Sequence, residues 1–344
     1  MIDWVDFVAP LTHETGQGSP FYAGEVMATK PDGELDWGIF KRMEIEGSHS
    51  TKIQIRSSSM DDGRQAVRVS GNLVKWFQGH NIFGTDDLSG LILEALARIL
   101  ADGNITPAPC EVEAWKTGDI ELHRIDVTES NDFGSKLACL NALRSLDATA
   151  NLKFRGRGLF NGHSLLFGKG SRNWSCTLYS KGAEIEKHKL PLTLSSTSLT
   201  DYAQGLLRME FRLLSMHLKK LRLDKLEAWG DNTPSEVHQN HLAQLSISET
   251  TMLKPADLEK LTPRLRGAYQ LWKDGHDLRS IFPRPTFYRY RKELLSMGID
   301  ISVKQERTES NVVPIGIKLV GKPVGIPDWA VNSPLYFQPR FHAL

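Results

Sequence analysis

The chain has 344 residues, of which 40% are hydrophobic and 24% are charged, and its formal net charge is +1. This length allows two domains with a sizeable core. A net charge near zero means that any nucleic-acid-binding surface must be a local patch. The three cysteines, Cys110, Cys139 and Cys176, are far apart and indicate neither a disulfide framework nor a zinc site.

The N-terminus and the hydropathy pattern bear on location. Asp3 and Asp6 stand where a secretory signal would carry basic residues. No apolar stretch reaches the length of a membrane-spanning helix. We therefore expect a cytoplasmic protein that does not act at a membrane.

Alternating apolar and polar residues predict a sheet in the first two thirds of the chain. The expected strands lie at residues 3–8, 51–56, 67–69, 120–128, 174–179 and 206–213. Apolar residues at helical spacing predict helices at 85–101, with Thr85 as the N-cap, and at 135–147. Because strands outnumber helices and hairpins are expected, the sequence favours an α+β fold, an antiparallel sheet with helices on one face.

Local composition divides the chain into three parts. Gly230-Asp231-Asn232 is typical of a boundary, and Thr233-Pro234 restarts a helix with a cap and a proline at its first position. Several prolines interrupt the last segment. We expect a sheet domain at 1–229, a mostly helical domain at 230–310 and an irregular tail at 311–344.

The helical part contains a basic, helix-turn-helix-like pattern, with a turn at 274–276 and a last helix at 285–297. Between Arg264 and Lys292, eight Lys and Arg residues oppose two Asp residues, a net charge of +6. The pattern predicts a last helix that enters a DNA groove, although an ordinary helical hairpin with a solvated basic face fits it as well. The expected DNA contacts are Arg284, Thr286, Arg289, Arg291 and Lys292.

A second basic stretch leads into the strand expected at 174–179. Between residues 151 and 173 there are five basic residues and no acid, with glycines and aromatic residues interleaved. Such a stretch can hold single-stranded DNA through charge and base stacking. The expected contacts are Lys153, Arg155, Arg157, Lys169 and Arg172.

Two carboxylates, Asp126 and Glu210, lie on strands that should be central in the sheet. A carboxylate at such a position needs a pairing cation or a metal, and salt bridges to Arg124 or Arg208 would be sufficient. In the functional interpretation both acids converge on Mg²⁺ or Mn²⁺, which prefer oxygen ligands. Arg208 or Lys181 would then offset the negative charge that develops on a phosphate.

Tyr179 lies on the polar side of its expected strand, because a period of two places it on one face with Ser175 and Thr177. A phenol has a pKa of about 10, so its attack on a phosphate needs a nearby cation, a base or a metal-activated phosphate. Lys181 and the preceding basic stretch could supply cations. Taken alone, a tyrosine on a strand indicates packing more often than chemistry.

The histidines exclude one class of nicking enzyme, since the His-hydrophobe-His triplet of the HUH type does not occur. His238 and His241 have helical spacing but no acidic helper in a zinc-protease arrangement, and we expect them on the surface. In the turn-rich segment 78–85, His80 could be a metal ligand, a DNA contact or a group that stabilises the loop by a hydrogen bond, and the last role is favoured. Asn81 beside it is a second candidate DNA contact.

Several motifs resemble those of the filamentous-phage gene II/X replication proteins, and they occur along the chain in the same order as in that family. The most specific are the segment 78–85, Gln-Gly-His-Asn-Ile-Phe-Gly-Thr, and Tyr179 followed by Lys181 and Glu184. The other matching segments are 1–4, 124–126, 205–210, 287–290, 311–314 and 327–329.

This resemblance implies a metal-dependent, site-specific DNA endonuclease and strand transferase that initiates rolling-circle replication. It would nick the plus strand of the double-stranded phage origin through Tyr179, keep a 5′-phosphotyrosine link and rejoin the displaced single strand. Asp126 and Glu210 would hold Mg²⁺ or Mn²⁺, and Glu184 would be a further ligand, a base or a partner of Lys181.

The resemblance also implies a host helicase and polymerase as partners, and an internal translation start for which Met252 is a candidate. Assembly of an oligomer on the origin stays open. Two other functions remain compatible with the sequence. One is a non-catalytic, sequence-specific DNA-binding protein, such as a repressor or an origin-marking factor, and the other is a protein that binds single-stranded nucleic acid on its sheet.

Overall fold

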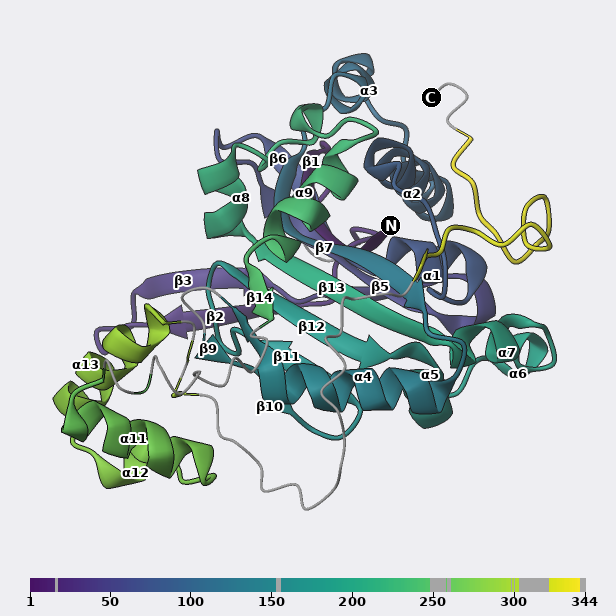
Figure 1. The fold of residues 1–344 in the computed structure, drawn as a ribbon. Coiled ribbons are helices and arrows are strands. Elements are labelled where there is room, and N and C mark those ends of the chain that lie inside the picture. Colours follow the sequence, from purple (N-terminus) through teal and green to yellow (C-terminus); the bar gives the residue numbers. More distant parts are fainter. Residues whose placement is uncertain are drawn as a thin grey trace.

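The computed structural model describes residues 1–15, 18–152, 156–247, 258, 261–297, 299, 301–302 and 322–340. Its main element is a ten-stranded antiparallel sheet in the order β10-β11-β12-β13-β7-β1-β6-β5-β4, with β15 paired to β7 (Figure 1). The strands are β1 (Ile2–Pro10), β4 (Met43–Glu46), β5 (Lys52–Ser59), β6 (Gln65–Gly71), β7 (Glu121–Asp132), β10 (Leu159–Phe160), β11 (Ser164–Phe167), β12 (Trp174–Ser180), β13 (Leu206–Leu214) and β15 (Lys322–Pro323).

Two small antiparallel sheets accompany the main one. The first has the order β14-β8-β9, and the second is a hairpin of β2 and β3. Their strands are β2 (Glu25–Thr29), β3 (Leu35–Phe40), β8 (Ala150–Leu152), β9 (Gly156–Arg157) and β14 (Leu245–Ile247).

One face of the main sheet carries the hydrophobic core. Inward side chains of the central strands, such as Val127, Cys176 and Phe211, pack in a single cluster with apolar residues of the helices. The helices in this cluster are α1 (Leu73–Gln78), α2 (Leu88–Gly103), α3 (Pro109–Lys116), α4 (Lys136–Thr149), α8 (Ser215–Leu221) and α9 (Thr233–Leu242). The expected α+β fold, with an antiparallel sheet and helices on one face, is confirmed. Within the described ranges, no helix is both long enough and apolar enough to cross a membrane.

The opposite face of the sheet is polar. Leu207, Met209, Phe211 and Leu213 of β13 belong to the core, so strand alternation turns Arg208, Glu210 and Arg212 to the other side. At one end of this face a smaller apolar cluster joins Ile82 and Phe83 to three short helices. These helices are α5 (Lys181–Lys187), α6 (Leu192–Ser195) and α7 (Leu199–Gln204).

One local prediction needs correction. The expected N-cap Thr85 is wrong by two residues, because the N-cap is Asp87, whose carboxylate accepts the backbone N–H of Gly90. After Tyr179 the chain enters α5 directly. Ser180 caps that helix by accepting the N–H of Ala183.

The C-terminal part is helical, as expected. Helices α11 (Pro263–Lys273), α12 (Leu278–Ile281) and α13 (Arg284–Leu295) enclose a hydrophobic cluster of their own. Its centre includes Leu265, Trp272, Phe287 and Leu294. Gly275 (φ 84°), between α11 and α12, adopts the left-handed conformation that glycine tolerates best. The remaining short 3-10 helices are η1 (Ser48–Ser50) and η2 (Leu226–Ala228).

The segment 322–340 has an irregular backbone, as expected for the tail, but it returns to the main sheet. β15 pairs with the end of β7, and the backbone N–H of Val324 donates to Ser130. Ala330 is fully buried in the smaller apolar cluster. The ring of Phe337 stacks on Phe77 of α1 with centroids 4.0 Å apart. This segment therefore packs as a part of the sheet unit rather than as a separate tail.

The expectation that His238 and His241 lie on the surface is wrong. Each is only 3% exposed, because this side of α9 packs on the aromatic residues of β12 and β13. Their rings lie 4.9 Å from those of Phe211 and Trp174, respectively. His241 Nε2 also lies 2.9 Å from Nε2 of His217. Burial lowers the pKa of His238 to about 4, and the nearby N-terminal charge adds to this effect.

This buried histidine predicts a specific acid sensitivity. His238 is neutral in the folded chain until about pH 4 but takes up a proton near pH 6.5 when unfolded. Its contribution to stability is therefore complete above pH 6.5 and is lost as the pH falls towards 4. When the pH is lowered from 7 to 4.5, the unfolding free energy of both proteins should fall. The fall should be about 2 kcal/mol smaller in His238→Phe than in wild type, as measured by urea denaturation. Equal losses in the two proteins would contradict this prediction.

Candidate active site on the polar face of the sheet

Tyr179 and Arg208 are direct neighbours across β12 and β13, on the polar face. Tyr179 is half-buried, and Arg208 is fully buried. Burial raises the pKa of Tyr179 well above its ordinary value, while the charge of Arg208 opposes this rise. The phenol thus stands beside a fixed cation, which is one requirement for a tyrosine that acts as a nucleophile.

The guanidinium of Arg208 connects the sheet to the segment 78–85. It donates to the backbone oxygens of Asn81 and Ile82 and, at 3.0 Å, to the hydroxyl of Ser130. A buried cation is costly unless its donors are satisfied, and these acceptors satisfy it. Arg208 therefore fixes the position of this loop over the sheet.

Asn81 lies at the centre of the polar cluster. Its side-chain oxygen accepts from Nζ of Lys181 at 2.8 Å, and its amide donates to Oδ1 of Asp3 at 2.8 Å. Asn72 donates to the same carboxylate oxygen at 2.8 Å. The amide of Asn81 thus orients a cation and an anion at once. The sequence indicated Asn81 as a DNA contact, and the structure gives its side chain this internal bridging position.

Lys181 and Glu184 form an ion pair one turn apart at the start of α5. The distance between Nζ and Oε2 is 2.6 Å. Lys181 is 1% exposed, and burial together with the charge of Arg208 lowers its pKa to about 8, although Glu184 opposes the shift. Nζ of Lys181 lies 5.9 Å from the ring centroid of Tyr179. Of the three roles left open for Glu184, the partner of Lys181 is the one that this geometry displays.

Three carboxylates gather on the same face. Burial raises the pKa of Glu210 to about 8, and the negative charges of Asp126 and Asp3 act in the same direction. Asp126 is 1% exposed and accepts from Arg124 and, at 3.3 Å, from Arg212. The salt bridges expected as the alternative to metal binding are therefore present for Asp126, with Arg212 in addition to Arg124.

The carboxylates of this face can be compared with the ligands that a divalent cation prefers. In the part of the chain that the structure describes, no three His, Cys, Asp or Glu side chains are arranged to hold a metal ion. Burial raises the pKa of Glu210, and the negative charges of Asp126 and Asp3 add to this rise while Arg212 and Arg208 oppose it. Neighbouring carboxylate oxygens are hard donors of the kind that Mg²⁺ or Mn²⁺ prefers.

Asp3 was not predicted as a site residue. In a regular strand Ile2 and Val5 would face opposite sides, yet both are buried in the core, because the register of β1 against β7 shifts between them. This bulge places Asp3 on the polar side beside Asn72 and Asn81. No alternation in the sequence signals such a bulge.

The returning segment 322–340 packs against the loop 78–85 and stabilises it. His80 is fully buried, and its Nε2 lies 2.8 Å from the backbone oxygen of Leu335. The N–H of Phe337 donates to the side chain of Gln78, which in turn donates to the backbone oxygen of Phe83. Burial lowers the pKa of His80 to about 4. His80 therefore has the loop-stabilising role favoured above, and its ring does not reach the surface that a DNA contact requires.

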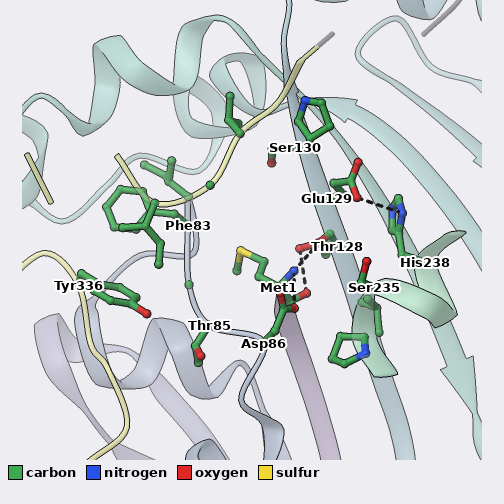
Figure 2. A pocket seen from close by; sticks show the side chains of 18 of the residues that line it. Met1, Phe83, Thr85, Asp86, Thr128, Glu129, Ser130, Ser235, His238 and Tyr336 are labelled. Atoms are coloured by element: carbon green, nitrogen blue, oxygen red, sulfur yellow. Dashed lines mark hydrogen bonds and ion pairs between the residues drawn. The ribbon is translucent and has the colours of Figure 1, made fainter. Parts of the chain in front are cut away.

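A cavity of about 410 Å³ lies where this loop, the start of β1, α9 and the returning segment meet (Figure 2). Phe83 and Tyr336 line one side of it, and Glu129 and His238 line the other. The N-terminal amine of Met1 donates to the backbone oxygen of Thr128 and pairs with Asp86 at 3.0 Å. The first residue of the chain is thus part of this wall.

The basic stretch before β12 is only partly placed. Lys153 and Arg155 lie outside the described residues, and Arg157 belongs to β9. Lys169 and Arg172 are exposed in the turn between β11 and β12. This turn lies at the opposite end of β12 from Tyr179.

The basic residues of the helical unit lie on α13 as expected. Arg284, Arg289 and Lys292 are exposed, while Thr286 and Arg291 are half-buried. Phe287, Tyr290 and Leu294 form the buried side of the helix. The exposed side therefore has the charge and the shape that a groove-binding helix needs, without any acid in its first turn.

Two sequence profiles cover most of the chain. The profile that describes the N-terminal part of a phage replication-associated protein matches residues 1–232, and the profile that describes its C-terminal part matches residues 258–335. The replication-associated protein of Enterobacteria phage I2-2 is 34% identical over 337 residues, which cover 95% of each chain. The chain belongs to this family of replication-associated proteins. The resemblance to filamentous-phage replication proteins is thereby confirmed.

The chain also matches more distant relatives. The replication-associated protein of Enterobacteria phage M13 is 23% identical over 331 residues, which cover 78% of each chain. Among solved structures, a rolling circle replication initiator protein from Geobacillus stearothermophilus aligns with 12% identity and a TM-score of 0.36. That alignment covers 74% of this chain and 88% of the other.

The contacts of Arg208 predict a large structural effect of its removal. Arg208→Met should lower the unfolding free energy by about 3–5 kcal/mol, because two backbone oxygens and Ser130 lose a buried charged partner. Arg212→Met, on the same strand but 42% exposed, should cost about 1 kcal/mol or less. Urea denaturation measures both values. Similar losses in the two variants would show that Arg208 does not hold the loop.

Proposed function

We propose that this member of the replication-associated protein family initiates rolling-circle replication. It nicks one strand at the double-stranded phage origin through Tyr179 and later rejoins the displaced single strand. The observation that carries this proposal is the position of the Tyr179 phenol on one face with Arg208, Lys181 and the three carboxylates. A tyrosine, two cations and a group of acids are the components that a metal-assisted phosphoryl transfer needs.

In the first step the hydroxyl oxygen of Tyr179 attacks the phosphorus of the scissile phosphodiester. The bond from phosphorus to the 3′ oxygen breaks, the phenolic proton passes to a base, and the departing 3′ oxygen takes up a proton. The product is a 5′-phosphotyrosine and a 3′-hydroxyl that the host polymerase extends. Attack of a 3′-hydroxyl on this phosphotyrosine restores a phosphodiester and frees Tyr179. One phosphoester is exchanged for another at each step, so joining needs no nucleotide cofactor.

The two buried cations have different parts in this reaction. Arg208 is held by its loop contacts and stabilises negative charge on the oxygen of Tyr179. Lys181 has a pKa of about 8, so it can gain or lose a proton near neutral pH. Asn81 and Glu184 keep its amine beside the tyrosine ring.

The carboxylates Asp126 and Glu210 would hold Mg²⁺ or Mn²⁺, and Asp3 would add negative charge beside them. A cation bound there supplies Lewis-acid polarisation of the scissile phosphate. Glu184 faces Lys181 in an ion pair, which supports a positioning role for it rather than a place among the metal ligands. Arg124 and Arg212 limit the negative charge of this cluster through Asp126.

The helical unit would recognise the duplex. Its last helix, α13, presents Arg284, Arg289 and Lys292 to solvent, and phosphate contacts from such residues position a protein on DNA. Lys169 and Arg172 are further candidates for contacts with the backbone. A host helicase and polymerase would act on the nicked origin, and the protein could assemble as an oligomer there.

Tyr179→Phe should abolish the covalent link between protein and DNA, because the variant lacks the attacking oxygen. Supercoiled origin DNA is incubated with Mg²⁺, and open circles and protein-bound 5′ ends are measured on denaturing gels. Tyr202→Phe, whose hydroxyl donates to the backbone oxygen of Gly325, is the matched control and should nick like wild type. An adduct that persists in Tyr179→Phe would remove Tyr179 from this role. Duplex binding by wild type without any nick would instead support a non-catalytic DNA-binding protein.

Glu210→Gln should reduce nicking by about 100-fold or more while leaving the fold intact. At pH 8 and above the metal-free variant should be at least as stable as wild type, because the ionised Glu210 is unfavourable beside Asp126 and Asp3. Mg²⁺ should raise the thermal unfolding midpoint of wild type but not that of Glu210→Gln. Both readouts come from thermal denaturation with and without the cation. Full nicking in the presence of a chelator would contradict the metal role.

A further inference from the structure

A second cavity, of about 430 Å³, lies beside the proposed active site and has no role in the mechanism above. Its walls come from four separate parts of the chain: the start of β1, η1 with the start of β5, α1 with its N-cap, and the connection after α5. The residues that line it are Trp4, His49, Ser50, Thr51, Lys52, Asn72, Lys75, Lys189, Leu190 and Pro191. We refer to this cavity as the lysine groove.

The charge of the lysine groove is entirely positive. Lys52, Lys75 and Lys189 line it, and none of the described lining residues is acidic. Lys52 pairs at 2.8 Å with Glu44, outside the groove. Lys75 and Lys189 form no ion pair with any residue in the described part of the chain. In a protein with a net charge of +1, two unpaired lysines and a third one in a single cavity indicate an anionic ligand.

The walls of the groove are fixed by hydrogen bonds. The hydroxyl of Ser48 in η1 donates to the backbone oxygen of Phe77 at 2.6 Å, and that of Thr51 donates to the backbone oxygen of Lys75 at 3.2 Å. His49 and Ser50 adopt left-handed conformations, with φ of 55° and 57°. Non-glycine residues in this conformation are uncommon and collect at binding sites, where the surrounding structure holds them.

The groove is continuous with the carboxylate cluster through two lining residues. Asn72 donates to Asp3 at 2.8 Å. The guanidinium of Arg124 lies 4.7 Å from the ring centroid of Trp4 and pairs with Asp126. A DNA strand that passes over the carboxylates can therefore continue into the lysine groove. A cation bound to the carboxylates would neutralise the phosphate at that point.

We propose that the lysine groove binds one single strand of DNA next to the phosphate that Tyr179 attacks. The proposal rests on the function proposed above and adds the path of the strand. A cavity of this volume holds a ligand the size of a small organic molecule, which fits a nucleotide unit but not a duplex. The three lysines would contact phosphates, and the half-buried Trp4 lines the same cavity as an aromatic wall.

The test measures binding by full-length chains that also carry Tyr179→Phe, so that no cleavage intervenes. The double variant Lys75→Gln, Lys189→Gln is compared with Lys30→Gln, Lys219→Gln, which has the same net charge but changes lysines paired elsewhere, with Glu34 and Asp61. The probes are a fluorescent single-stranded oligonucleotide and a duplex, both with the origin sequence. Dissociation constants are measured over a series of salt concentrations.

The groove variant should bind the single strand on the order of tenfold more weakly. The slope of log K against the logarithm of the salt concentration should be smaller in magnitude by about 1.4, because two phosphate contacts are lost. Its duplex affinity should change less than about twofold. The control should match the parent on both probes. An unchanged single-strand affinity, or an equal loss on the duplex, would overturn the proposal.

Failure of the proposed function is recognised separately. Chains with an intact Tyr179 are assayed for the covalent adduct on origin DNA. If the wild type forms no adduct, the nicking mechanism is wrong whatever the groove binds. If the wild type forms the adduct and the groove variant retains full single-strand affinity, only the lysine groove is refuted.

Discussion

A single buried guanidinium determines the geometry of the proposed active site. Arg208 projects from a central strand into a region without solvent, where its charge must be satisfied by the protein. The acceptors that satisfy it are the backbone oxygens of Asn81 and Ile82. Holding these oxygens also fixes the side chain of Asn81, which then bridges Lys181 and Asp3. The loop, the lysine and the first carboxylate thus follow from one charge on β13.

The two faces of the sheet show how one scaffold separates stability from chemistry. The apolar face carries the core and the helices, and substitutions there act through packing. The polar face concentrates carboxylates and cations that would be unfavourable if they were isolated. The raised pKa of Glu210 and the lowered pKa of Lys181 show that neither group is fully compensated by its neighbours. Such incompletely balanced charges are typical of sites that receive a charged ligand.

Periodicity in the sequence was sufficient to predict six strands of the main sheet, β1, β5, β6, β7, β12 and β13, and the side on which Tyr179 lies, but it did not predict the shorter strands. The alternation in β12 and β13 determines which residues reach the polar face, and this depends on local pattern alone. His238 and His241 were expected on the surface because no acidic residue completes a metal site with them. Only the packing of α9 against Trp174 and Phe211 shows that they are buried. Long-range contacts of this kind have no local signal.

The same limit applies to Asp3 and to the lysine groove. Asp3 reaches the site through a bulge in β1, which no alternation announces. The groove combines residues from four distant parts of the chain, none of which forms a basic run. The basic residues of the stretch 151–173 are close together in sequence, so the sequence alone indicates them. The cations beside the carboxylates of the proposed active site come together only in the fold.

The return of residues 322–340 to the sheet has a consequence for synthesis. His80 meets Leu335, and Gln78 meets Phe337, across separations of 255 and 259 residues. A ribosome therefore releases the loop that carries Asn81 long before it makes the segment that supports this loop. Translation proceeds at about 5–20 residues per second, so the nascent chain spends many seconds with that support missing. The loop gains these contacts only after residues 322–340 emerge, which ties the assembly of the proposed active site to the synthesis of that segment.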